Sequence, residues 1–327
     1  MTSNEFAVVD RMFEDLREVT PAVRLRLGGA SVSVRSGDES CARLVEERFG
    51  HLVERDPHDS AELSVRLMSG EIPPLSLATG VNRLPNGGVA TFEPGRDLVL
   101  YRPSVGIDLL KTPSTWGEVE PISYPLGAAI SSWAVDTGLF PAHAAAVEFN
   151  GRGVLLVGES GMGKSTTSLA CALAGAGLLG DDLCLIDPVR RVIHSWYGTV
   201  KLLNDSAEAL GATEWQRLGV NDAGKAVVAV SQIDQLRLTT TAVLDLVVIL
   251  RPSDTPATSG SLLSESQAVT ALRCTAWPAS SVPNGLSAWL RHVSLIARTV
   301  PIIELPRDRP PEAMARRVAE LLEHHVA

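Results

Sequence analysis

Three patterns in the sequence predict an α/β fold in which a small α+β domain precedes a larger α/β domain. A glycine-rich segment lies between an apolar run and a helix-forming segment at residues 153–174. Apolar runs then alternate with amphipathic helical patterns toward the end of the chain. Before residue 139, short strand-like runs are separated by Pro-Gly turns. We therefore divide the chain into a front domain, residues 1–138, and a back domain, residues 139–327.

The front domain begins with a helical pattern over residues 5–19, followed by a β-hairpin that turns at Gly28-Gly29 and a helix that opens at Asp38. The remaining front elements are expected to be strands at 61–67, 88–92, 98–102 and 105–110 and a helix at 125–137. No catalytic constellation is recognisable among them. This domain is therefore assigned to substrate recognition or to pairing between subunits of a homo-oligomer.

The back domain continues with strands and helices in alternation. The pattern predicts strands at 227–230, 242–250 and 300–305, helices at 286–296 and 311–326, and a surface loop at 252–260.

Composition restricts the partners of the chain. Its 327 residues carry a formal net charge of −9, which disfavours nucleic acid as a general partner because phosphate backbones bind basic surfaces. No apolar run reaches membrane-spanning length, so no membrane partner is expected. The four cysteines are scattered without a C-x-x-C spacing, and the first twenty residues are rich in charge; both features favour a cytoplasmic protein.

Residues 158–165 read G-x-x-x-x-G-K-S, the pattern of a phosphate-binding P-loop. The apolar run 153–157 before it and the helical segment after it supply the strand and helix that the motif requires. A chance glycine-rich turn is the alternative, and four fixed positions argue against it. Lys164 is expected to reach phosphate oxygens, and Ser165 to bind Mg²⁺. The residues assigned to nucleotide binding are Gly158, Glu159, Ser160, Gly161, Met162, Gly163, Lys164, Ser165 and Thr166.

Asp181 and Asp182 interrupt an apolar stretch, residues 178–186, that otherwise has the pattern of a buried strand. Burying a carboxylate is costly unless it is paired or bound to a metal. On a strand the two side chains would point to opposite faces, so that one faces the phosphates and the metal. The alternative is an ordinary hairpin corner at Gly180-Asp181.

His143 lies upstream, at the start of the apolar stretch that leads to the P-loop strand. A single histidine beside alanines is most often structural. Together with the loop and the two aspartates, however, it completes the parts of a phosphoryl-transfer site: a phosphate cradle, a metal ligand, a base and a group that tunes the base.

This set of residues resembles the catalytic domain of HPr kinase/phosphorylase, whose fold is related to ATP-dependent phosphoenolpyruvate carboxykinase. The specific likeness covers about residues 139–205. It implies an HPr-kinase-like P-loop fold for the back domain, with ATP and Mg²⁺ as cofactors. It further implies that Asp181 is the base, that Asp182 helps to bind the metal, and that His143 contacts Asp181.

The sequence departs from that family at two points. The region after the aspartates contains no Leu-Glu-Ile-Arg-Gly stretch, whose glutamate supports the metal in the family. The arginine-containing loop that grips substrate phosphate is not recognisable, and Arg251 is either its substitute or a solvated arginine at a strand end.

The resulting hypothesis is an ATP- and Mg²⁺-dependent kinase that phosphorylates a hydroxyl. A serine of a small protein or peptide, such as a natural-product precursor peptide, ranks first as acceptor, and Arg24, Arg26 and Arg35 could form a docking strip for it. A small hydroxylated metabolite ranks second. The third alternative is a nucleotide-binding regulator without transfer activity.

Overall fold

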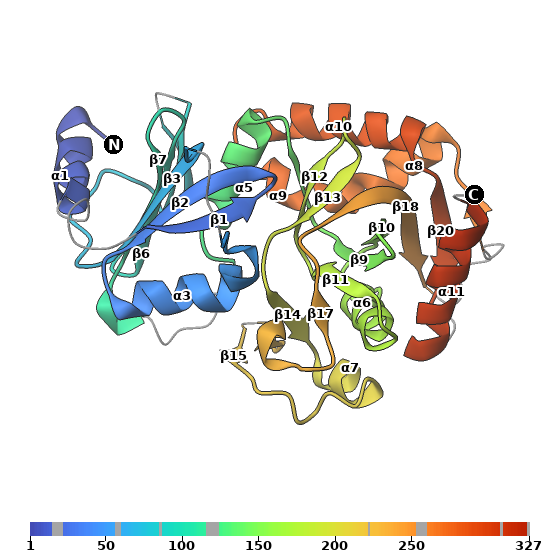
Figure 1. The fold of residues 1–327 in the computed structure, drawn as a ribbon. Coiled ribbons are helices and arrows are strands. Elements are labelled where there is room, and N and C mark those ends of the chain that lie inside the picture. Colours follow the sequence, from blue (N-terminus) through green and yellow to red (C-terminus); the bar gives the residue numbers. More distant parts are fainter. Residues whose placement is uncertain are drawn as a thin grey trace.

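The front part of the chain folds into a seven-stranded mixed sheet with the order β1-β2-β3-β7-β6-β5-β4 (Figure 1). The computed structural model describes residues 1–14, 22–55, 60–84, 87–115, 124–221, 223–252, 260–307 and 310–325. The hairpin predicted at Gly28-Gly29 is confirmed, whereas β4 was not predicted. The strands are β1 (Val23–Leu27), β2 (Ala30–Ser36), β3 (Leu63–Ser69), β4 (Gly80–Arg83), β5 (Val89–Glu93), β6 (Asp97–Arg102) and β7 (Gly106–Lys111).

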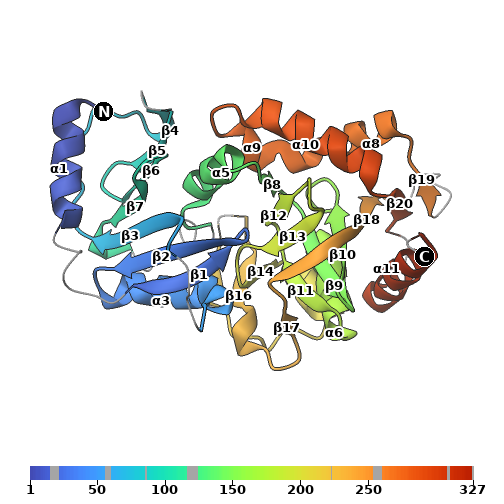
Figure 2. The same ribbon diagram turned by 45° about the horizontal axis from the view of Figure 1, so that its top comes forward.

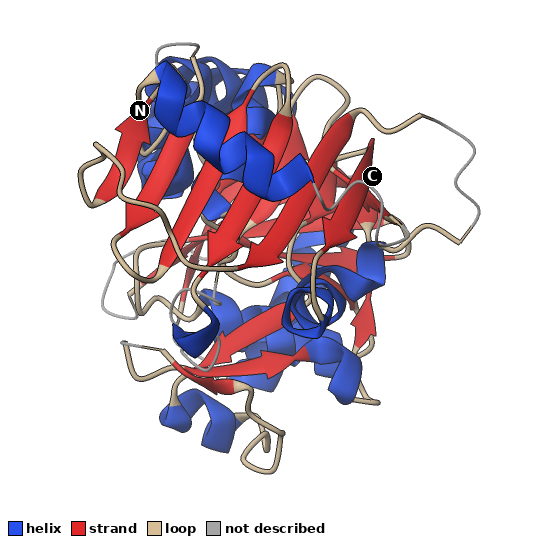
Figure 3. Ribbon diagram, turned by 90° about the vertical axis from the view of Figure 1, so that its left-hand side faces the viewer, coloured by secondary structure: helices blue, strands red, loops and turns tan. Residues whose placement is uncertain are grey.

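Helices cover both faces of this sheet because its strands alternate apolar side chains between the two faces. Along β6, Leu98 and Leu100 pack with Val9 of α1 (Ser3–Glu14), which lies across the outer face in Figure 3. The side chains of Val99 and Tyr101 point inward to the core formed with α3 (Glu39–Phe49) and α5 (Gly127–Asp136). The part of the predicted first helix beyond Glu14 lies outside the described residues.

The larger sheet of the back part has the strand order β17-β11-β9-β10-β18-β13-β12-β8, and β20 also pairs with β18. Its strands are β8 (Phe140–Ala142), β9 (Ala145–Phe149), β10 (Arg152–Val157), β11 (Gly177–Gly180), β12 (Cys184–Asp187), β13 (Val192–Ser195), β17 (Arg237–Leu238), β18 (Thr241–Arg251), β19 (Ser261–Leu262) and β20 (Ile302–Pro306). A separate three-stranded sheet contains β14 (Thr199–Leu202), β16 (Ala226–Ala229) and β15 (Gly219–Val220).

Helices lie on both faces of the larger sheet (Figures 1 and 2). Successive residues of β10 show this. Val154 and Leu156 lie in one hydrophobic cluster, with side chains of α6 (Lys164–Leu173) and α11 (Pro311–His325). Leu155 and Val157 lie in another hydrophobic cluster, with side chains of α8 (Glu265–Ala271) and α10 (Gly285–Thr299). Two further α-helices among the described residues are α7 (Asn204–Ala209) and α9 (Trp277–Ser280). The chain therefore has a mixed α/β fold with several sheets. Within the described residues, no helix has the length and apolarity needed to cross a membrane.

The front and back parts share one hydrophobic core. Leu185 of β12 and Trp196 are fully buried in the same cluster as Leu67 of β3 and Ile130 of α5. Polar contacts reinforce this junction, since the Tyr197 hydroxyl donates to the carbonyl of Pro125 at 2.7 Å. The front sheet ends with β7 at Lys111 and the larger sheet begins with β8 at Phe140, but the core that supports them is continuous between the two.

Because of this shared core, Leu185→Ala should destabilise both parts together. Removing a fully buried leucine costs about 2–5 kcal/mol, so we expect one urea unfolding transition with a lower midpoint. Leu262→Ala, at a position that is 61% exposed, is the control and should change stability by less than about 0.5 kcal/mol. A separate front-domain transition that the Leu185 variant leaves unshifted would contradict the shared core.

Candidate phosphoryl-transfer site

Three segments meet at one edge of the larger sheet because of the direction in which their strands run. β9 is antiparallel to both β10 and β11, so β10 and β11 end where β9 begins. The glycine-rich loop follows β10, the aspartates follow β11, and His143 precedes β9. The amide of Ala144 donates to the carbonyl of Asp182 at 3.1 Å and joins two of these segments directly.

The loop between β10 and α6 has the strand–loop–helix arrangement expected from its sequence. Gly161 and Gly163 adopt left-handed backbone angles, with φ of 82° and 85°, that residues with a side chain rarely adopt. Gly158 packs so closely that an added Cβ would lie 3.1 Å from the carbonyl oxygen of Leu250. The first-turn amides of α6 have no partner within the helix and therefore present its positive end to the loop. All nine residues assigned to nucleotide binding, 158–166, lie in this loop and the first turn.

Lys164 lies inside the loop rather than on the protein surface. Its side chain is buried, and Nζ donates to the carbonyls of Gly158 at 2.8 Å and Glu159 at 3.3 Å. Burial lowers the pKa of its ammonium group from the ordinary value. A second cation lies directly after β20, since Nη1 of Arg307 donates to the carbonyl of Gly161 at 3.0 Å.

Asp181 and Asp182 occupy a bend between β11 and β12, and not the middle of a strand as the sequence suggested. β12 pairs with β8 and β13 rather than with β11, so the bend is not a hairpin corner either. Asp182 has a left-handed backbone with φ of 79°, a conformation that costs non-glycine residues free energy and is concentrated at functional sites.

Asp181 faces the loop. Its Oδ2 accepts a hydrogen bond from the amide of Lys201 at 2.8 Å, while Oδ1 is buried without a hydrogen-bond partner among the described residues. Burial and the adjacent Asp182 raise the pKa of Asp181 to about 6, against smaller lowering effects from the Lys201 amide and the nearby Ser165 side chain. The hydroxyl of Ser165 and the unpaired Oδ1 are oxygen donors of the kind that Mg²⁺ prefers.

Asp182 has a different environment. Its Oδ2 accepts from the Tyr124 hydroxyl and lies 3.6 Å from Nζ of Lys201, and its Oδ1 lies 3.6 Å from Nδ1 of His143. Burial acts to raise the pKa of Asp182, but His143, Lys201 and the Tyr124 hydroxyl lower it overall. The sequence-based expectation paired His143 with Asp181, whereas in the structure the imidazole lies beside Asp182.

His143 and two aromatic rings close this side of the site. Burial lowers the pKa of His143, and the neighbouring Asp182 opposes this effect. The Trp277 ring lies 5.9 Å from the His143 ring and 5.7 Å from the Tyr124 ring, measured between centroids. Nζ of Lys201 lies 2.8 Å from the centroid of the Tyr124 ring.

Sequence reasoning missed Tyr124, Trp277, Arg307 and Lys225. Lys225 precedes β16, and its charge acts on the pKa of His143, Lys164 and Asp182. The four residues come from four separate segments and share no spacing with the glycine-rich loop. No local pattern could have connected them.

Arg251, the candidate substitute for the family's phosphate-gripping arginine, is paired with Glu304, with 2.8 Å between Nε and Oε1. Both side chains line a polar cavity of about 470 Å³ that also adjoins Gly158 and Glu159. Arg251 therefore lies beside the glycine-rich loop, with a carboxylate partner of its own.

Within the described part of the chain, no group of three or more His, Cys, Asp and Glu side chains could hold a metal ion. A magnesium site does not require such a group, because Mg²⁺ is commonly held by one or two protein oxygens together with substrate phosphates. Ser165 and Asp181 fit this description.

No family model matches the chain, and no curated protein matches it by sequence. Among solved structures, the chain is similar to the Hpr(Ser) kinase/phosphatase from Coxiella burnetii, with 15% sequence identity and a TM-score of 0.33. The match covers 57% of this chain and 89% of that chain. Likeness at this level does not define a function, which has to be inferred from the site itself.

The pKa shift of Asp181 predicts how stability depends on pH when a chelator removes metal ions. The folded protein holds the Asp181 proton up to about pH 6, whereas the unfolded chain releases it near the ordinary aspartate pKa of 3.8. The folded state binds more protons in this window, so the Asp181 contribution to the free energy of unfolding falls as pH rises from about 4 to 6.

Asp181→Asn removes this contribution, and its amide oxygen can still accept from the Lys201 amide. We therefore expect the variant to gain stability relative to wild type as pH rises from 4 to 7, measured by urea unfolding in EDTA. A stability difference between the two proteins that does not change with pH would show that Asp181 titrates normally.

Proposed function

We propose that this protein is an ATP- and Mg²⁺-dependent phosphotransferase that transfers a phosphoryl group to a hydroxyl. The observation that carries the proposal is the convergence of the glycine-rich loop, Lys164 and the Asp181-Asp182 pair at one sheet edge. A phosphate cradle, a buried cation and two carboxylates in different environments are the parts that phosphoryl transfer requires.

The loop amides and the first turn of α6 would bind the phosphates of the nucleotide. Lys164 would exchange its bonds to the carbonyls of Gly158 and Glu159 for bonds to phosphate oxygens. Arg307, which lies against Gly161, supplies a second positive charge at the loop. The polar cavity beside Gly158 offers space for the rest of the nucleotide.

Ser165 and Asp181 would hold Mg²⁺. The support is the buried, unpaired Oδ1 of Asp181 together with the effect of the Ser165 hydroxyl on the same carboxylate. When bound, the metal supplies positive charge that offsets the charge of the phosphates. This proposal exchanges the roles expected from the sequence, in which Asp182 was the metal ligand.

Asp182 is then the proposed base. Its Oδ2 is occupied by Tyr124, but Oδ1 faces His143 across 3.6 Å, too far for a hydrogen bond. The acceptor hydroxyl can donate to this oxygen and transfer its proton there as the phosphoryl group moves. His143, whose Nδ1 has no hydrogen-bond partner among the described residues, would orient the same hydroxyl.

Two classes of acceptor follow from the sequence, a serine of a peptide or small protein and a small hydroxylated molecule. The third alternative, a nucleotide-binding regulator, requires the loop but not the base. The left-handed backbone of Asp182 and the three side chains that surround its carboxylate favour an enzyme, because a regulator has no use for a carboxylate held at that cost.

Lys164→Ala tests the nucleotide site. We expect the Kd for ATP·Mg²⁺ to rise roughly tenfold or more, because one charge-assisted contact to phosphate is lost. Calorimetry gives the Kd, and Arg43→Ala at an exposed position on α3 is the control. An unchanged Kd in a folded Lys164→Ala protein would rule out this loop as the phosphate site.

The kinetics of two variants distinguish the roles of the two aspartates. Turnover is measured as phosphate release, with water as the surrogate acceptor. Asp182→Asn should lower turnover by about 10²-fold or more while ATP binding persists, as expected for loss of a general base. Asp181→Asn should instead raise the Mg²⁺ concentration needed for half-maximal turnover. The opposite pattern would restore the assignment made from the sequence.

A further inference from the structure

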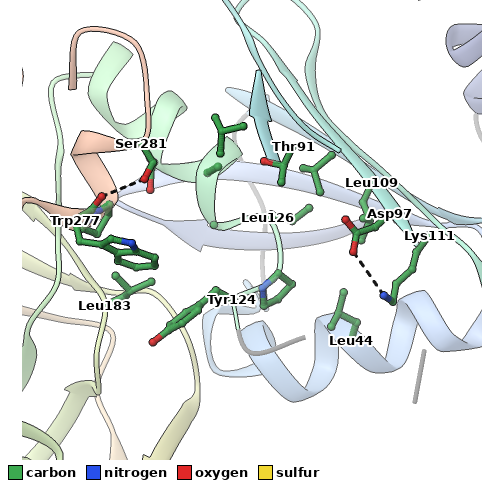
Figure 4. A pocket seen from close by; sticks show the side chains of 17 residues that line it. Leu44, Thr91, Asp97, Leu109, Lys111, Tyr124, Leu126, Leu183, Trp277 and Ser281 are labelled. Atoms are coloured by element: carbon green, nitrogen blue, oxygen red, sulfur yellow. Dashed lines mark hydrogen bonds and ion pairs between the residues drawn. The ribbon is translucent and has the colours of Figure 1, made fainter. Parts of the chain in front are cut away.

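A second cavity, distinct from the polar one beside Gly158, lies between the inner face of the front sheet and helices α5 and α9. Its volume is about 290 Å³, at the small end of the range for small-molecule sites, roughly 300–1,000 Å³. Figure 4 shows side chains of the front strands on one side of it and Trp277 and Ser281 of the back part on the other.

This cavity reaches the proposed base through three of its lining residues. The Tyr124 hydroxyl is bonded to Asp182, Leu183 follows Asp182 in the chain, and the Trp277 ring packs edge-on against His143. Asp182 itself is not among the described residues that line the cavity, but Tyr124 both lines it and contacts the carboxylate that would take the acceptor proton.

The lining is apolar in the middle and charged at the far end. Val99, Leu109 and Leu126 form apolar wall, while Asp97 and Lys111 lie 3.8 Å apart at the end formed by β6 and β7 (Figure 4). Val99, Leu109 and Leu126 thus belong both to the hydrophobic core and to the wall of the cavity. Such a site fits a compact molecule with an apolar body and polar groups at its ends.

We propose that this cavity binds the phosphoryl acceptor, and that the acceptor is a compact amphipathic alcohol. Its hydroxyl would lie at the end formed by Tyr124 and Trp277, directed toward Oδ1 of Asp182. Its apolar body would lie between the front sheet and α5, and a second polar group at Asp97 and Lys111. The inference rests on the proposed function for the identity of the reaction, but not for the existence of the binding site.

A free small molecule suits the cavity better than a peptide. The volume accommodates a single compact group, and walls from both parts of the chain surround it. The arginine strip suggested for peptide docking is partly neutralised, because Arg26 forms an ion pair with Glu54 at 2.6 Å. The peptide is therefore an outcome of the test and not part of the proposal.

The experiment measures binding of benzyl alcohol, glycerol and the peptide acetyl-Gly-Ser-Phe-Gly-amide by ligand-observed NMR, each with and without AMP-PNP and Mg²⁺. Thr91→Trp fills the cavity from β5. If that variant does not fold, Val81→Trp fills the cavity instead from β4, where Val81 is exposed and pairs with Thr91. Ser33→Trp, on β2 outside the cavity lining, is the matched control.

We expect benzyl alcohol to bind wild type at least tenfold more tightly than glycerol does. Filling the cavity should weaken the binding of benzyl alcohol at least tenfold and leave the affinity for AMP-PNP unchanged. Ser33→Trp should alter neither affinity. No benzyl alcohol binding to wild type, equal binding to a cavity-filled variant, or binding of the peptide alone would overturn the proposal. A different result would contradict the proposed function itself, namely that wild type does not bind AMP-PNP.

Discussion

The burial of two adjacent carboxylates is the constraint on which the rest of this site depends. Asp181 and Asp182 are only 5% and 6% exposed, and two like charges at this depth are costly unless other groups compensate them. The compensation comes from the Lys201 backbone and ammonium, the Tyr124 hydroxyl and His143. These groups belong to segments far apart in the sequence, so the carboxylates can be buried only when the segment before α5, the start of β9 and strand β14 are all in place.

The same arrangement makes the two carboxylates unequal. Asp181 has one backbone donor and an unpaired oxygen, and its pKa is raised; Asp182 has a phenol, an ammonium and an imidazole around it, and its pKa is lowered. Two residues of one type thereby acquire different chemistry from their surroundings alone. In the proposed function this inequality separates the metal ligand from the base, and it explains why neighbouring aspartates need not share a role.

The front sheet contributes to the site through the face that it turns toward the back part. One stretch of that face packs with Leu185 and Trp196 in a shared core, and the next stretch, at β5, β6 and β7, lines the cavity that leads to Asp182. A sheet fixed by a continuous core is a rigid wall, and rigid walls define the shape of a binding site more sharply than loops do. The front part is thus both a structural support for the back part and one side of the proposed acceptor site.

The sequence by itself determined the features that depend on neighbouring residues. Strand β10, the glycines with left-handed backbones, Lys164 at the start of α6 and the hairpin at Gly28-Gly29 all follow from local pattern, as do helices α5, α10 and α11. The tertiary structure alone decided which aspartate faces Ser165 and which faces His143, because the bend after β11 turns the chain away from the alternation of a strand. It also decided that Tyr124, Trp277 and Arg307 belong to the site and that an apolar cavity adjoins it. Such contacts join residues with no common spacing, and they arise only when the order and direction of the strands bring separate segments to one edge.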